Sequence, residues 1–248
     1  MDLAPRDMVS RAIISEIREG RGILGSDGTH YVNLDVSHLG KKVIDEKLPE
    51  ITGFARTYLG VEPTKEPIPI QPTAHYAMGG IPTNVECEVL ADEKGTIIKG
   101  LYAAGECACV SVHGGNRLGT NSLLDLVVFG RRGGKRMAEF IKTADYSPIN
   151  STPAEKTKEQ MDKYLNATGS EKVYALRTEL QEWMMDKCGI FRNEADLKAM
   201  IDKLNELKEK FKSISIQDKG KVFNTDLMEA IELENLLLNA EATVYSAY

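Results

Sequence analysis

One stretch of the sequence, residues 100–132, constrains the fold more than any other. It begins with a short apolar run at residues 101–104, followed by a glycine, which predicts a buried strand. Residues 106–120 are rich in glycine and include a histidine and an arginine. From Asn121 onwards apolar residues recur at helical spacing, so Asn121 or Ser122 is the expected N-cap of a helix. A strand, a glycine-rich loop and a helix start in this order predict a ligand-binding loop.

The start of that helix favours an anion, or a ligand that develops negative charge. The first backbone N–H groups of a helix have no partner within the helix, and the helix dipole places partial positive charge beside them. Asn116 and Arg117 lie on the loop just before the helix, where their side chains can reach the same ligand. Taken alone, the pattern also fits an ordinary connection between a strand and a helix.

Length and composition exclude several classes of protein. A chain of 248 residues is long enough for one large or two small domains. The net charge of −6 and the dispersed basic residues argue against a nucleic-acid partner. No apolar run approaches the roughly 20 residues of a membrane span, and the first residues do not form a signal peptide. No metal site and no disulfide framework are expected from the spacing of the four cysteines, Cys87, Cys107, Cys109 and Cys188.

The expected fold class is α+β, in three parts. Residues 1–72 predict a small α+β unit, with helices at 5–19, 35–48 and 49–60, a strand at 31–34 and an extended, proline-rich segment at 63–72. Residues 73–145 predict a hairpin around the turn at 92–95, then the strand, loop and helix described above. Residues 146–248 predict a helical bundle, with helices near 154–165, 171–187, 193–213 and 222–248. One buried stripe is expected on the third of these helices, formed by Leu197, Met200, Ile201, Leu204, Leu207 and Phe211.

The literal motifs resemble a known family. The loop and helix read HGGNRLGTNSLLDLVVFGR at residues 113–131. Three further segments agree with the same family in the same order: PRDMVSRAI around Arg6, EPIPIQPTAHYAMGGIPT at residues 66–83, and GLYAAGE at residues 100–106. Together they resemble the flavoprotein subunit of succinate dehydrogenase and fumarate reductase. The resemblance covers most of the chain and thins toward the C-terminus.

The resemblance implies a division of the chain and a reaction. Residues 1–72 would be a segment of the capping domain, residues 73–145 the returning part of an FAD-binding α/β domain, and residues 146–248 the helical C-terminal domain. The intact parent would be a flavoprotein of electron transport and the tricarboxylic acid cycle. It would oxidise succinate to fumarate, or run the reverse reaction, by hydride transfer to or from FAD and proton transfer through an arginine.

Carried over position by position, the resemblance implies roles for three residues that contact substrate. His75 and Arg117 match the pair that binds the substrate carboxylates, and Arg6 matches the catalytic arginine that transfers the proton. The planar guanidinium donors of arginine suit a dicarboxylate. Arginine is a poor base on its own, because its pKa lies above about 12. Asp7 is adjacent to Arg6 in the sequence and receives no role.

The resemblance also implies FAD contacts. Glu106 matches a cofactor contact, and Ser122 and Leu123 match backbone contacts beside the flavin ring. Reduced flavin carries negative charge near that edge, which a helix N-terminus stabilises. His113, in the same loop, receives no role. The remaining loop residues are interpreted as structural: Cys107 and Cys109 as small apolar fillers, and Gly114, Gly115 and Gly119 as sites of positive φ or close backbone approach.

A dinucleotide fingerprint is missing, because no GxGxxG follows an early strand. Against the family, the chain is expected to lack the N-terminal FAD fingerprint and the extreme C-terminus, to be inactive when isolated, and not to retain FAD alone. The resemblance implies an iron–sulfur subunit and membrane anchor subunits as partners. It places the parent in the cytoplasm, peripheral to the inner face of the cell membrane. Two alternatives stay open: an L-aspartate oxidase-type flavoenzyme, and a non-catalytic fragment serving as a structural or partner-binding module.

Overall fold

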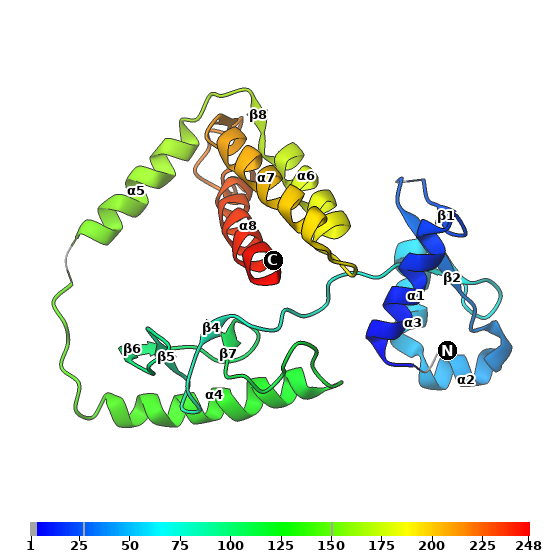
Figure 1. Ribbon diagram of the computed structural model, residues 1–248, viewed down its shortest axis with the longest axis horizontal. Helices are drawn as coiled ribbons and strands as arrows, with labels where there is room; N and C mark the ends of the chain where they lie inside the picture. Colours follow the sequence, from blue (N-terminus) through cyan, green and yellow to red (C-terminus); the bar gives the residue numbers. More distant parts are fainter. Residues whose placement is uncertain (1–3, 27, 150) are drawn as a thin grey trace. The chain divides into compact units, whose positions relative to one another are not determined.

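The structure is a computed structural model that describes residues 4–26, 28–149 and 151–248. It divides into two compact units, one formed by Thr73–Ile149 and the other by Met1–Pro72 together with Asn150–Tyr248. Figure 1 labels the helices and strands along the chain. Helices predominate and the strands form small sheets, which confirms the expected α+β class. Within the described residues, no helix has the length and apolar character needed to cross a membrane.

The first elements form a helix and a three-stranded sheet. Helix α1 (Arg6–Arg18) follows Pro5 and ends before Gly20, as the sequence predicts. Strands β1 (Ile23–Leu24) and β3 (Ile68–Ile70) pair antiparallel with the two edges of β2 (His30–Leu34). Of these strands only β2 is predicted as one. The segment that contains β3 is extended as expected, and its Pro69 fits an edge strand because proline has no N–H to donate.

Short helices connect β2 to β3. They are η1 (Ser37–Leu39), α2 (Gly40–Lys47), α3 (Pro49–Phe54) and η2 (Ala55–Leu59), and they cover the two predicted helical segments. Ile44 of α2 and Ala55 of η2 are buried between them. Gly60 ends the run in a left-handed conformation, which a residue without a side chain adopts without strain.

The Thr73–Ile149 unit contains two strand pairs and one long helix. Strands β4 (Ile81–Pro82) and β7 (Ala108–Cys109) are parallel. Strands β5 (Glu88–Leu90) and β6 (Ile97–Tyr102) are antiparallel. The predicted turn joins β5 to β6, where the Asp92 carboxylate accepts bonds from the backbone N–H groups of Lys94 and Thr96. Helix α4 (Asn121–Phe140) follows the glycine-rich loop.

One prediction for this unit is wrong. Residues 101–104 do not form a separate buried strand, because β6 continues without a break to Tyr102. The side chain of Leu101 is 49% exposed. Within the described residues β6 pairs only with β5, so no neighbouring strand covers its other edge.

The C-terminal helices form the largest core. Helices α5 (Thr152–Leu165), α6 (Val173–Lys187), α7 (Glu194–Phe211) and α8 (Thr225–Ala247) match the four predicted helices closely. The expected stripe on α7 is confirmed: Leu197, Met200, Leu204 and Leu207 are buried, and Ile201 and Phe211 pack against them. Asn193 and Asn224 cap α7 and α8 through their side-chain oxygens. A short parallel pair, β8 (Glu171–Lys172) with β9 (Ile214–Ser215), is not predicted.

Charged side chains on α7 give the stability of the bundle a pH dependence. Glu206 pairs with Lys203 and Lys210 at 2.7 and 2.6 Å, and these hydrogen bonds lower the pKa of Glu206 from 4.5 to about 2. The Glu206 carboxylate therefore stays ionised to a lower pH in the folded state than in the unfolded state. The resulting stability is fully present above pH 4.5 and is lost as the pH falls toward 2.

We predict that Glu206→Gln lowers the free energy of unfolding at neutral pH and that the difference from the unsubstituted chain disappears near pH 2. The effect is small and salt-sensitive because the Glu206 side chain is half-exposed. Urea unfolding at stepwise pH measures it. The control is Glu182→Gln, at an exposed position on α6, which should show no such convergence. A constant difference across the whole pH range would contradict the prediction.

Candidate functional site

A close backbone approach joins the His75 segment to the glycine-rich loop. The N–H groups of Ile81 and Thr83 donate to the carbonyls of Cys107 and Cys109, at 2.9 and 3.1 Å. Gly80 lies at φ +116°, and a Cβ atom there would stand 2.5 Å from the Cys107 carbonyl oxygen. Only glycine fits this position, so the β4–β7 pairing requires it.

This pairing places Glu106 beside the segment that carries His75. The Glu106 carboxylate accepts a hydrogen bond of 3.0 Å from the backbone N–H of Ala77. The side chains of His75 and Glu106 are both exposed. Two residues predicted from separate motifs therefore belong to one surface of the Thr73–Ile149 unit.

Arg117 is held by an aromatic ring. Its guanidinium carbon lies 4.7 Å from the centroid of the Tyr76 ring, a cation–π contact. One guanidinium N–H donates to the Leu118 carbonyl at 3.4 Å. The Arg117 Nε is buried and has no hydrogen-bond partner within the part of the chain that the structure describes. Among the described residues no carboxylate forms an ion pair with Arg117, so its charge and Nε donor suit an anionic ligand.

His113 and Asp125 lie next to this contact. The His113 Nε2 and the Asp125 Oδ2 are 3.0 Å apart, and the two side chains are only 11% and 4% exposed. The His113 ring meets the Tyr76 ring edge-on, with 5.7 Å between centroids. Burial, together with the negative charges of Asp125 and Glu106, raises the pKa of the Tyr76 phenol, so this hydroxyl stays protonated at neutral pH.

The start of α4 differs from the prediction by one or two residues. The N-cap is Thr120, not Asn121 or Ser122, and it adopts a left-handed conformation at φ 70°. The Thr120 carbonyl accepts from the N–H groups of Leu123 and Leu124, which begins the helix there. Thr, Asn and Ser are all good N-caps, so three adjacent candidates cannot be ranked from residue type.

The uncapped helix start fits part of a flavin cofactor. The Thr120 side chain makes no capping hydrogen bond, although the N–H groups of Asn121, Leu123 and Leu124 donate to the backbone carbonyls of Leu118 and Thr120. Ser122 is half-buried, and Leu123 is 61% exposed. Gly114 has φ 60°, and a Cβ at Gly115 would meet no atom within 4 Å. These groups could hold the charged edge and a ring face of FAD.

The remaining predicted residue lies in the other unit. Arg6 is the first residue of α1 and its side chain is exposed. The neighbouring Asp7 pairs with Arg11 at 2.6 Å, which leaves Asp7 without an evident catalytic role. The structure thus gathers His75, Glu106, Arg117 and the α4 start in one unit.

One match to the letters of the dinucleotide pattern has the wrong structural context. The letters GRGILG at residues 20–25 satisfy GxGxxG. They follow helix α1 and lead into strand β1, and the N–H of Gly20 caps α1 by donating to the Ile17 carbonyl. A dinucleotide fingerprint needs the opposite order, a strand before the glycines and a helix after them.

Sequence reasoning missed the support around Arg117. No sequence motif assigns a role to Tyr76, Asp125 or His113. One signal was available: Asp125 interrupts the apolar run SLLDLVV on a helix, and a buried carboxylate requires a partner. The apolar-filler interpretation is wrong for Cys107, which is exposed, whereas Cys109 is half-buried.

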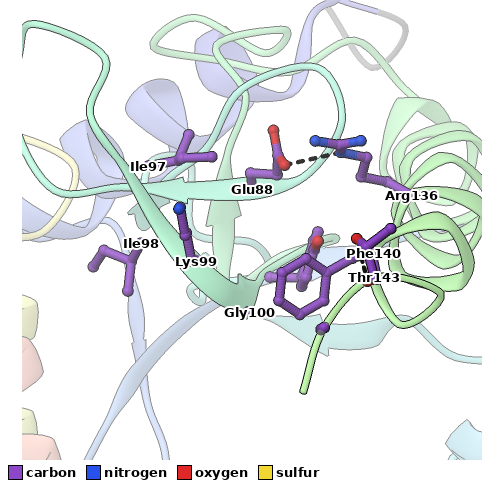
Figure 2. A pocket seen from close by; sticks show the side chains of 10 residues that line it. Glu88, Ile97, Ile98, Lys99, Gly100, Arg136, Phe140 and Thr143 are labelled. Carbon is purple, nitrogen blue, oxygen red and sulfur yellow. Dashed lines mark hydrogen bonds and ion pairs between the residues drawn. The ribbon is translucent and has the colours of Figure 1, made fainter. Parts of the chain in front are cut away.

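A separate hollow of about 310 Å³ lies where the β5–β6 hairpin meets the second half of α4 (Figure 2). Glu88 points toward Arg136 there, with 2.9 Å between the carboxylate and the Nε. Hydrogen bonds from Asn84 and from Arg136 lower the pKa of Glu88. The charged pair is internally satisfied, and the hollow contains none of the predicted site residues.

Comparisons with known proteins identify the class to which the chain is similar. An FAD binding domain model matches residues 1–123, and a model of the fumarate reductase flavoprotein C-terminus matches residues 177–248. These two matches define the class as FAD-binding flavoproteins of the oxidoreductases.

Similar proteins narrow this class to one family. The chain is 45% identical to the succinate dehydrogenase flavoprotein subunit of Rickettsia bellii over 99% of its own length and 42% of that protein. It is 45% identical to the fumarate reductase flavoprotein subunit of Escherichia coli K12, over 100% and 40%. A solved E. coli quinol fumarate reductase chain matches with a TM-score of 0.88 at 44% identity, over 100% and 41%. The chain belongs to the succinate dehydrogenase and fumarate reductase flavoprotein family, and it spans about two fifths of the length of these relatives.

We predict that Gly80→Ala destabilises the Thr73–Ile149 unit by about 1–3 kcal/mol, because the new methyl group would push the Cys107 carbonyl out of the β4–β7 pairing. Amide exchange at Ile81 and Thr83 should accelerate. Gly115→Ala is the matched control, since nothing lies within 4 Å of its Cβ position. Equal effects of the two substitutions would show that the close approach is not required.

Proposed function

We propose that this chain is part of a flavoprotein subunit that oxidises succinate to fumarate or reduces fumarate to succinate. The names of its relatives support the reaction. The observation that carries the proposal concerns Arg117. Its guanidinium lies over the Tyr76 ring, and its buried Nε has no hydrogen-bond partner among the described residues. A fixed arginine without a carboxylate partner is a binding group for a carboxylate ligand.

The proposed roles divide between binding and proton transfer. FAD, when bound, supplies a two-electron acceptor or donor. Arg117 and His75 bind the substrate carboxylates and orient the carbon chain. Arg6 holds or moves the proton at the carbon adjacent to the one that exchanges hydride. Because free guanidinium is a poor base, this role requires surroundings that lower the free-energy cost of deprotonation.

The cofactor contacts lie at the strand end and the helix start. We propose that Glu106 contacts FAD, and that the backbone at Ser122 and Leu123 contacts the edge of the flavin ring. The dipole at the start of α4 supports this assignment, since it stabilises negative charge there. We further propose that the isolated chain is inactive and does not retain FAD, because no fingerprint of the required strand–glycine–helix order occurs in its sequence.

Partners and location follow from the same family. We propose an iron–sulfur subunit and membrane anchor subunits as partners, which would place the parent at the cytoplasmic, inner face of the cell membrane. The matched structures include quinol fumarate reductase with menaquinol molecules, which supports an association with membrane quinols.

We predict different kinetic defects for two arginines in the complete flavoprotein subunit. Arg117→Lys should raise KM for succinate about tenfold or more, because lysine cannot make the bidentate contact. Arg6→Lys should lower kcat by about 100-fold or more with a smaller change in KM, because it removes a proton-transfer group. Steady-state succinate oxidation measures both values.

The matched control is Arg131→Lys, at an exposed position on α4, which should leave both constants unchanged. Wild-type kinetics in either site variant would remove that residue from the proposed mechanism. Turnover of L-aspartate in place of succinate would support the aspartate oxidase alternative.

A further inference from the structure

Two buried polar residues take no part in the proposed chemistry. His113 and Asp125 are nearly inaccessible to solvent, yet both carry ionisable side chains. Burying such groups is costly unless they satisfy each other. Their 3.0 Å contact supplies that partner and fixes both side chains in one arrangement.

The contact also fixes the orientation of the His113 ring. The His113 Nε2 faces the Asp125 Oδ2, and the two atoms are within hydrogen-bonding distance. The imidazole ring is thereby held in one orientation. Its Nδ1 is buried and has no hydrogen-bond partner in the described part of the chain.

The fixed imidazole supports the ring that holds Arg117. The His113 and Tyr76 rings meet at an interplanar angle of 83°, an edge-to-face geometry that favours aromatic pairs. The Tyr76 ring in turn holds the Arg117 guanidinium. Asp125, His113, Tyr76 and Arg117 thus form a continuous series of contacts from the helix α4 to the glycine-rich loop.

We propose that Asp125 and His113 are positioning residues that act through Tyr76 to hold the Arg117 guanidinium in one orientation. A preorganised arginine loses less conformational freedom when it binds a carboxylate. The identity of the carboxylate ligand rests on the proposed function, but the positioning itself does not.

The test is the Arg117 Nε–H signal in NMR spectra of the full 248-residue chain, recorded without any dicarboxylate. In the unsubstituted chain we expect a slowly exchanging proton whose shift is displaced by the Tyr76 ring current. Asp125→Leu conserves volume but removes the acceptor, and His113→Gln removes the ring. Each substitution should abolish the displacement of the Arg117 Nε–H chemical shift and speed its exchange with solvent at least about tenfold. The signal should then resemble that of an exposed arginine such as Arg131.

Matched variants separate positioning from damage to the fold. Asp125→Asn keeps an accepting oxygen and should retain most of the displacement. His38→Gln removes an exposed histidine of the other unit and should change nothing. The amide signals of Ile81 and Thr83 should persist in all variants, which shows that β4–β7 remains paired.

The outcomes distinguish this inference from the proposed function. If the Arg117 signal in Asp125→Leu and His113→Gln equals that of the unsubstituted chain, the positioning role is wrong, whatever the kinetics show. If the Arg117 signal in Asp125→Asn equals that in Asp125→Leu, the accepting oxygen at position 125 does not hold the Arg117 guanidinium in place. This result would also overturn the inference. If the signals change as expected but Arg117→Lys leaves KM unaltered, the positioning stands and the proposed function fails.

Discussion

The proposed site depends on the close approach between Gly80 and the Cys107 carbonyl. The parallel β4–β7 contact is only two residues long, yet it joins two loops that are distant in sequence. A side chain at position 80 would separate them. Through this contact the His75 segment lies beside Glu106, and Tyr76 reaches the loop that carries Arg117. The contacts of the Tyr76 ring with Arg117 and His113 join the same two segments.

Electrostatics then decides what the site can bind. Arg117 has no carboxylate partner among the described residues, whereas many other arginines of the chain are paired, such as Arg56 with Glu62 and Arg136 with Glu88. The helix start beside it is uncapped and adds partial positive charge. Both features favour an anion. A dicarboxylate and a reduced flavin are the two anions that the family's reaction provides.

The elements that could be predicted are those whose signal lies within one segment of the sequence. The long helices α1, α4, α6, α7 and α8 follow from apolar residues that recur at helical spacing within one segment. The two-residue strands β1, β8 and β9 could not be predicted, because each exists only through pairing with a partner elsewhere in the chain. The literal motifs suggested Arg117 and Glu106. They could not reveal the Tyr76–Arg117 contact, which requires the folded loops.

The most direct measurement is a fumarate titration of the chain, followed through its backbone amide NMR signals. We expect the chemical-shift changes to cluster at residues 75–77 and 113–122. We expect Arg117→Lys to weaken the apparent affinity about tenfold, equivalent to about 1.4 kcal/mol. Shifts spread over the helical bundle, or an unchanged response in Arg117→Lys, would contradict the assignment of this loop as the dicarboxylate site.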